Sequence, residues 1–97
     1  MIIALLHQHY NKQHLEEVKS EMMKLGAPTI RAIWDETQGM WRAIEGCHRI
    51  RAAKELGITP IIKEYKGKSF RNDAGEIYKS SDLLNDWKVS IITFEEE

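Results

Sequence analysis

The fold of this chain is decided by residues 41–57, WRAIEGCHRIRAAKELG, where a short apolar strand runs directly into a helix. The strand is expected from Trp41 to Glu45 and the helix from Cys47 to Leu56, with Gly46 between them. A glycine at such a junction lets backbone N–H groups approach a ligand, and the first helical turn adds amide donors and the positive end of the helix dipole. Arg49 supplies a guanidinium that can clamp phosphate through paired hydrogen bonds. The stretch therefore predicts an anion site, with phosphate as the best match.

Length and composition indicate a single domain that spans residues 1–97. The chain has 97 residues, of which 42% are hydrophobic and 30% charged, as in an ordinary soluble globular protein with one core. The net charge of -1 gives no global attraction to nucleic acid, so such a contact would require a local basic patch. One cysteine excludes an internal disulfide framework and suits a reducing compartment. Because only six residues precede His7, the apolar start is too short for a signal peptide or a membrane span, so we expect a cytoplasmic protein without membrane contact.

The spacing of apolar residues predicts the element order β-α-β-β-α-β-α-β. Strands are expected at residues 2–6, 29–34, 40–45, 60–65 and 89–94, and helices at 12–25, 47–56 and about 80–87. Asn11 is the expected N-cap of the first helix, and Gly26 and Gly57 are expected to end the two longer helices. Residues 66–75 are polar and contain glycine, which indicates an exposed loop or a loose hairpin tip. This order predicts an α/β (α+β) domain with a mixed sheet and two to three helices.

The opening stretch and the strand after it resemble the phosphate-binding segment of the ParB/sulfiredoxin superfamily. ParB proteins carry there a strand, a Gly-x-x-Arg turn, an Arg-Ala-Ala helix that ends in Leu-Gly, and another strand. This chain matches that order with Gly46 to Arg49, Arg51 to Ala53, Leu56-Gly57 and the strand at 58–62. The first helix and the hairpin at 30–44 also follow the family order, so the resemblance covers roughly residues 1–65. It implies a single ParB/sulfiredoxin-like domain, in which residues 66–97 form a C-terminal extension with no assigned role.

The ParB branch of this resemblance implies nucleotide binding. In ParB proteins this segment clamps a nucleoside triphosphate, usually CTP, which gates closure on DNA. Carried over, Gly46, Arg49 and the backbone amides of Cys47 and His48 would hold the phosphates of ATP or CTP with Mg²⁺, in a DNA-associated role in a plasmid, phage or chromosome. Two positions depart from this branch. Cys47-His48 stands where ParB commonly has Glu-Arg, and residues 7–12 lack the arginine that ParB supplies after its first strand.

The sulfiredoxin branch is matched literally by the sequence Gly-Cys-His-Arg at 46–49. Those enzymes use ATP, magnesium and the motif cysteine to repair over-oxidised peroxiredoxin. A Cys47 thiol at a helix N-terminus, beside Arg49 and His48, would ionise more easily. Against this branch, the chain has Glu45 where sulfiredoxins have a second glycine, and it lacks their Arg-Pro box near the start. The alternative for Cys47 is a small residue that begins a helix.

Three residues of the segment are candidates for catalysis, because some relatives on this fold transfer phosphate to small molecules. Glu45 could act as a general base or a magnesium ligand, and Cys47 and His48 adjoin the phosphate turn. Hydrolysis of a nucleotide, phosphate transfer and nuclease activity all remain open. The alternative for Glu45 is a strand-end carboxylate that pairs with Arg42 or Arg49.

Other polar residues give weaker indications of function. His7 and His9 share one face of the first strand and could contact the ligand, but too few further ligands are available to predict a metal site. Lys63, Lys66, Lys68 and Arg71 could contact nucleic acid if they line one loop, or could be solvated surface residues. The alternative function is therefore a non-enzymatic regulatory module that binds protein or DNA and retains a vestigial pocket.

Overall fold

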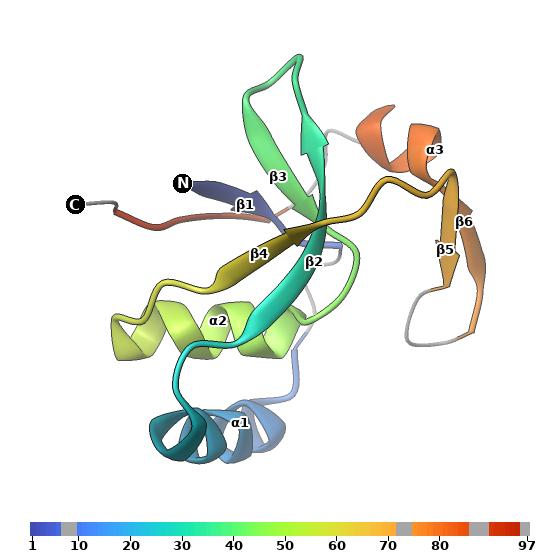
Figure 1. The fold of residues 1–97 in the computed structure, drawn as a ribbon. Helices are drawn as coiled ribbons and strands as arrows, with labels where there is room; N and C mark the ends of the chain where they lie inside the picture. Colours follow the sequence, from blue (N-terminus) through green and yellow to red (C-terminus); the bar gives the residue numbers. More distant parts are fainter. Residues whose placement is uncertain (7–9, 72–74, 86–89, 96–97) are drawn as a thin grey trace.

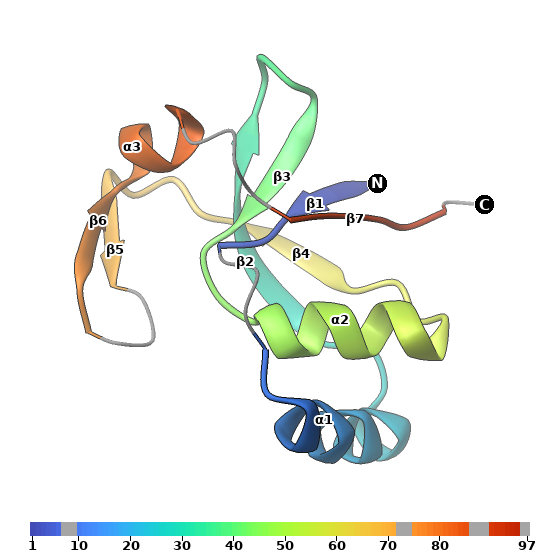
Figure 2. The same cartoon turned by 180° about the vertical axis from the view of Figure 1, so that it is seen from behind.

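The order of elements places two helices on one side of a central sheet and a small hairpin with a third helix on the other side (Figure 1). The structure, a computed structural model, describes residues 1–6, 10–71, 75–85 and 90–95. Its elements are β1 (Ile2–Ala4), α1 (Lys12–Leu25), β2 (Thr29–Asp35), β3 (Met40–Ala43), α2 (Cys47–Leu56), β4 (Ile61–Glu64), β5 (Ser69–Arg71), β6 (Ile77–Lys79), α3 (Ser80–Asn85) and β7 (Ile91–Thr93). Viewed from behind, α2 lies along the sheet and α1 packs on the outer side of α2 (Figure 2). In the described part of the chain, no helix is both long and apolar enough to cross a membrane.

The central sheet is mixed, which confirms the predicted fold class. Its 5 strands follow the order β4-β2-β3-β1-β7, and β5 pairs only with β6 in a separate sheet. The β2–β3 hairpin is antiparallel, with Trp34 opposite Trp41, whereas β1 runs parallel to β3 and β4 runs parallel to β2. Because β3 leads directly into α2, the parallel pairing with β1 brings the start of the chain next to the Gly46 turn.

Both long helices begin and end where the sequence predicts. The side chain of Asn11 accepts a hydrogen bond of 2.8 Å from the backbone N–H of His14, which satisfies a donor that the helix itself leaves unpaired. Gly26 and Gly57 follow the last helical residues with φ of 85° and 69°, a region that glycine enters without a Cβ clash.

The C-terminal third differs more from the sequence prediction. Residues 66–75, expected as a loop or loose hairpin tip, contain β5, which pairs with the unpredicted strand β6. These strands have only 3 residues each. The hairpin that they form is anchored by Phe70, which packs in one buried cluster with Ile33, Ile44 and Leu83. The first and last strands are also shorter than expected, since β1 ends at Ala4 and β7 spans Ile91–Thr93. The predicted ends at Trp87 and Val89 lie outside the described residues.

Apolar side chains pack on both faces of the central sheet. On the helical side, Ile3 and Ile30 contact the buried face of α2, which carries Ile50 and Ala53. On the opposite side, Ile33 and Ile44 are covered by the hairpin and α3. Because Ala43 at the end of β3 packs in the first core and the next residue, Ile44, packs in the second, the segment that precedes the Gly46 turn is held from both sides.

A buried ion pair joins the two strands of the β2–β3 hairpin. Asp35 and Arg42 are only 4% and 1% exposed, and Arg42 Nε donates to Asp35 Oδ2 at 2.9 Å. Asp35 Oδ1 also accepts from the backbone N–H of Gln38 at 3.2 Å, within the turn that reverses the chain. The pair therefore links the turn to the interior of the sheet.

Candidate functional site

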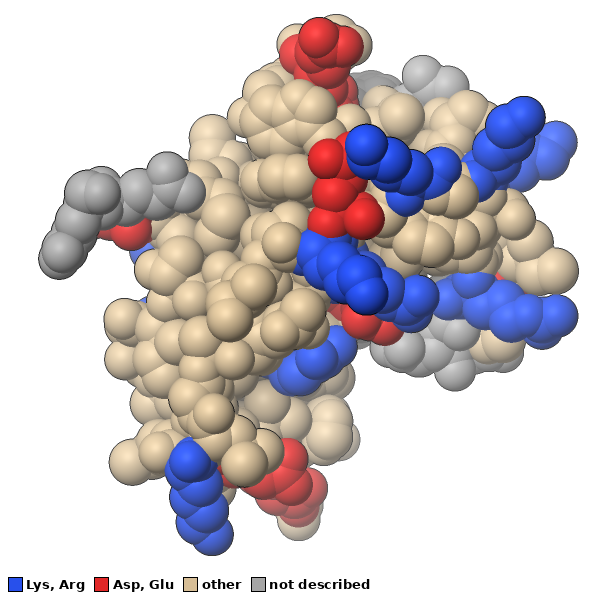
Figure 3. All heavy atoms as spheres, in the orientation of Figure 1, with Lys and Arg blue, Asp and Glu red and all other residues tan. Residues whose placement is uncertain are grey.

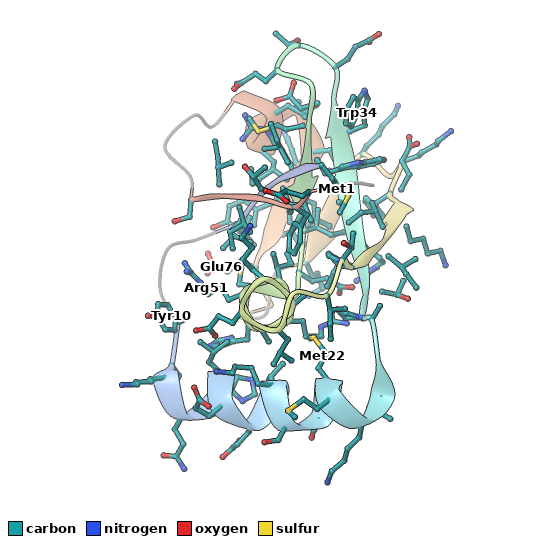
Figure 4. All side chains as sticks on the ribbon, turned by 90° about the vertical axis from the view of Figure 1, so that its left-hand side faces the viewer. Met1, Tyr10, Met22, Trp34, Arg51 and Glu76 are labelled. Atoms are coloured by element: carbon teal, nitrogen blue, oxygen red, sulfur yellow. The ribbon has the colours of Figure 1, made fainter. Side chains whose placement is uncertain are left out.

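A pocket of about 580 Å³ opens where the N-terminal end of α2 faces the side of α1. The whole predicted segment from Glu45 to Arg49 contributes to its lining. The opposite wall comes from α1 and the segment after it, with Val18, Glu21, Met22, Leu25 and Pro28 among the lining residues. Figure 4 shows Met22 between α1 and α2, at the buried end of this wall. The structure thus joins the predicted phosphate turn to a cavity of ligand size.

Gly46 forms the turn that begins α2. Its backbone is left-handed, with φ 78° and ψ 30°, and its carbonyl accepts the first helical hydrogen bond from Ile50 at 2.8 Å. A Cβ at this position would lie 2.7 Å from Ile30 Cδ1 and 3.1 Å from Arg49 Nη2, so the turn has room only for glycine. Glycine offers no side chain to cap the helix, and Gly46 and the first-turn residues Cys47 to Arg49 line the pocket. The first turn of α2 therefore begins at the pocket without a side-chain cap.

Arg49 lies beside this turn and lines the pocket. Its Nη1 donates to the backbone oxygen of Thr29 at 3.0 Å, and its Nη2 lies 3.6 Å from Glu45 Oε1. The side chain is 40% exposed, and the Nη2 contact is longer than a hydrogen bond. The Thr29 contact holds the guanidinium beside the pocket while Nη2 keeps capacity for a ligand oxygen.

Glu45 is held by two arginines. Arg31 grips both carboxylate oxygens, with Nε to Oε1 at 3.1 Å and Nη2 to Oε2 at 2.8 Å. The hydrogen bonds from Arg31 outweigh partial burial and, with the charges of Arg31 and Arg49, hold the pKa of Glu45 below its usual value. The expected pairing with Arg49 is present, but the alternative with Arg42 is wrong, because Arg42 points to the buried Asp35. A carboxylate held ionised in this way suits charge balance and positioning better than general-base catalysis, which needs a pKa near the working pH.

His48 connects the starts of the two helices. Its Nε2 accepts a hydrogen bond of 2.9 Å from the backbone N–H of Asn11, the residue that caps α1. This contact assigns the neutral ring its proton on Nδ1. The ring also meets His14 edge to face, with centroids 4.5 Å apart. Among the candidates for catalysis, His48 is thus engaged in holding α1 beside the Gly46 turn.

Cys47 lies at the pocket but faces the protein interior. Its side chain is 6% exposed and belongs to the apolar core that includes Ile50 and Ala53. This burial favours the role of a small residue that begins a helix over that of an exposed nucleophile.

Two of the predicted ligand contacts lie outside the described residues, and two residues that line the pocket were not predicted from the sequence. His7 and His9 lie outside the described residues. Within the described ranges, no three His, Cys, Asp or Glu side chains come together as a metal site. Glu21 and Pro28 line the pocket although no sequence motif marks them. They could be found only from the packing of α1 against α2, which sequence spacing does not specify.

Similarity to known proteins adds no further information about the ligand. Comparisons of the chain with protein-family models, with curated proteins and with solved structures found no match. The resemblance of residues 1–65 to the ParB/sulfiredoxin superfamily therefore stays a prediction from the sequence.

Proposed function

We propose that the pocket binds a phosphate-bearing small molecule, with a nucleotide such as ATP or CTP as the first candidate. One observation carries this proposal: the left-handed Gly46 turn, the Arg49 guanidinium and a cavity of about 580 Å³ coincide at one helix N-terminus. Helix N-termini bind phosphate through their amides and dipole, and the cavity lies within the usual range for small ligands.

The two walls of the pocket suit the two ends of a nucleotide. Phosphate oxygens would meet the first-turn amides and Arg49, whose contact with Glu45 is weak enough to yield. The less polar end of the nucleotide would lie against Val18, Met22 and Pro28 of the opposite wall. The binding energy would thus come from charge-assisted hydrogen bonds at one end and from apolar burial at the other.

Magnesium, if it accompanies the phosphates, fits one carboxylate of the pocket better than the other. Mg²⁺ sites in nucleotide-binding proteins use one or two carboxylates together with phosphate oxygens and water. Both oxygens of Glu45 are occupied by Arg31, whereas Glu21 has no ion-pair partner within the described ranges. Glu21 would therefore hold the Mg²⁺ ion. The ion would neutralise the negative charge of the phosphates, which would lie near the carboxylates of Glu21 and Glu45.

The same geometry supports binding more directly than catalysis. Glu45 is tied to Arg31 and His48 to Asn11, so neither is poised to move a proton. Hydrolysis, phosphate transfer or nuclease activity would need a further group brought by the ligand or by a partner. The second candidate is a regulatory module for protein or DNA, in which Arg49 keeps its contacts to Thr29 and Glu45 and the pocket stays closed to nucleotides.

A nucleotide should raise the melting temperature of the protein. A ligand at a hundred times its Kd stabilises the folded state by about 2.7 kcal/mol, because it binds only that state. The measurement is thermal melting with ATP, CTP and ADP, each with and without Mg²⁺. Replacement of Arg49 with Ala should weaken the affinity roughly ten- to hundredfold, since a charge-assisted hydrogen bond contributes about 1.5–3 kcal/mol.

Two further variants separate this outcome from general effects. Arg71→Ala removes the same charge from β5, away from the pocket, and should leave the nucleotide shift unchanged. Cys47→Ala should also keep the shift, because the thiol is buried in the core. If no nucleotide changes the melting temperature, or if Arg49→Ala binds like the parent protein, the proposed site is wrong.

A further inference from the structure

Basic residues are concentrated on one part of this chain although the net charge is only -1. Helix α1 is balanced, with three lysines and three glutamates, whereas around the β5–β6 hairpin the basic residues outnumber the described carboxylates. We define the hairpin surface as Lys63, Lys66, Lys68, Arg71 and Lys79. Figure 3 shows Lys and Arg side chains spread over this side of the molecule. Glu64 and Glu76 are the only carboxylates among the described residues of 61–79, so the surface is locally positive.

The pairing of β5 with β6 determines which side chains face outward. Ser69 lies opposite Lys79, Phe70 opposite Tyr78, and Arg71 opposite Ile77. Residues that lie opposite one another share a face of the ribbon. Phe70 is buried on the central sheet, so its face is the inner one. Lys79 and Arg71 therefore lie on the outer face.

Most of this positive charge is not neutralised by the protein. Lys63, Lys68 and Lys79 are exposed, and none of them forms an ion pair with a carboxylate in the described part of the chain. Lys66 has only a contact of 3.9 Å with Glu64, and its side chain is 82% exposed. Such a surface can exchange its counterions for the phosphates of a polyanion.

We propose that the hairpin surface docks on duplex DNA, with the β5–β6 ribbon at the major groove. The groove of B-form DNA is about 12 Å wide and admits a two-stranded ribbon, whereas the deep, narrow major groove of A-form RNA does not. Lys79 and Arg71 project from the outer face of the ribbon, and Lys66 and Lys68 lie in the segment before it, where flanking phosphates would pass. This surface lies across the sheet from α1 and α2, so the proposal is independent of the nucleotide pocket (Figure 1).

The test compares two variants with the same change in charge. Lys68→Glu/Lys79→Glu reverses two charges of the hairpin surface, and Lys12→Glu/Lys24→Glu reverses two exposed lysines of α1. Binding to a short fluorescent DNA duplex is followed by anisotropy across a series of salt concentrations. The α1 variant should bind like the parent, while the hairpin variant should bind at least about tenfold more weakly. Its plot of log affinity against log salt should be shallower by about 1.8, because each lost phosphate contact removes about 0.9 from the slope.

Four results would overturn the proposal. The first is an absence of duplex binding by the parent protein at low salt, and the second is an equal loss of affinity in the α1 variant. The third is binding of single-stranded DNA or double-stranded RNA at least as tightly as duplex DNA, because the fit of the ribbon to the major groove would then not explain the binding. The fourth is tighter binding to poly-glutamate or to anionic vesicles, which would assign the surface to another polyanion. Far-UV circular dichroism checks that both variants keep the fold.

Discussion

Replacement of Arg42 with Met should lower the free energy of unfolding by about 3–5 kcal/mol, the usual cost of removing one partner from a buried ion pair. Arg42 is 1% exposed, and Asp35 would remain in the interior with backbone N–H donors of the turn, such as that of Gln38, but without its cation. A buried carboxylate without its cation either stays charged at a high energy or takes up a proton. Urea denaturation at neutral pH measures the loss.

The double variant Asp35→Leu/Arg42→Met distinguishes the lost pair from a simple packing defect. It leaves no buried charge, so it should recover most of the stability that Arg42→Met loses. The pH dependence gives a second check. Burial raises the pKa of Asp35, but the hydrogen bonds from Arg42 and Gln38 and the charge of Arg42 outweigh it and lower the folded-state pKa below 3.8.

The sign of this pH effect follows from the lowered pKa. The ionised pair stabilises the fold above the unfolded value of 3.8, and this contribution disappears as the pH falls through the lower folded value. The parent protein should lose this contribution in acid, and Arg42→Met should lack it at neutral pH already. Equal stability of Arg42→Met and the parent at neutral pH would contradict the role assigned to the pair.

Replacement of Gly46 with Ala should both destabilise the protein and abolish nucleotide binding. The left-handed backbone at φ 78° costs a residue with a Cβ about 1–2 kcal/mol. The new Cβ would also lie 2.7 Å from Ile30 Cδ1, in a fully buried side chain, and 3.1 Å from Arg49 Nη2. Ile30 and Arg49 would have to move, so the guanidinium would leave the turn. Thermal melting with and without the nucleotide measures both effects.

Gly57 provides a matched control at the other end of the same helix. Its φ is 69°, so Gly57→Ala should carry a similar backbone cost, but a Cβ there would have no atom within 4 Å. This variant should melt at a lower temperature and still respond to the nucleotide. If Gly46→Ala responds equally well, the close approach at the turn is not needed for binding.

Local features of the sequence were sufficient for the two long helices and for the Gly46 turn. The apolar spacing of 12–25 and 47–56, together with Asn11, Gly26 and Gly57, specifies both helices to the residue. These signals act between residues three or four apart, which a helix brings into contact whatever the rest of the chain does. The five residues from Glu45 to Arg49 were identified for the same reason, because a strand, a glycine and a helix start are adjacent in the chain.

Contacts between distant segments could not be predicted in the same way. Arg31 binds Glu45, and Arg42 binds Asp35, because strand register decides which of several arginines meets each carboxylate. The hairpin formed by β5 and β6 is likewise too short to order itself, and it depends on Phe70 reaching a core built by other strands.

The sequence alone determined that α2 starts at a glycine turn with a nearby arginine. Only the tertiary structure decided that α1 closes a pocket over that turn, with Glu21 and Met22 on its wall and the thiol of Cys47 turned inward. The physical reason is the range of the forces involved. Helix caps and turns are set by neighbouring residues, whereas a cavity is the space left when helices and strands from distant parts of the chain pack against one another.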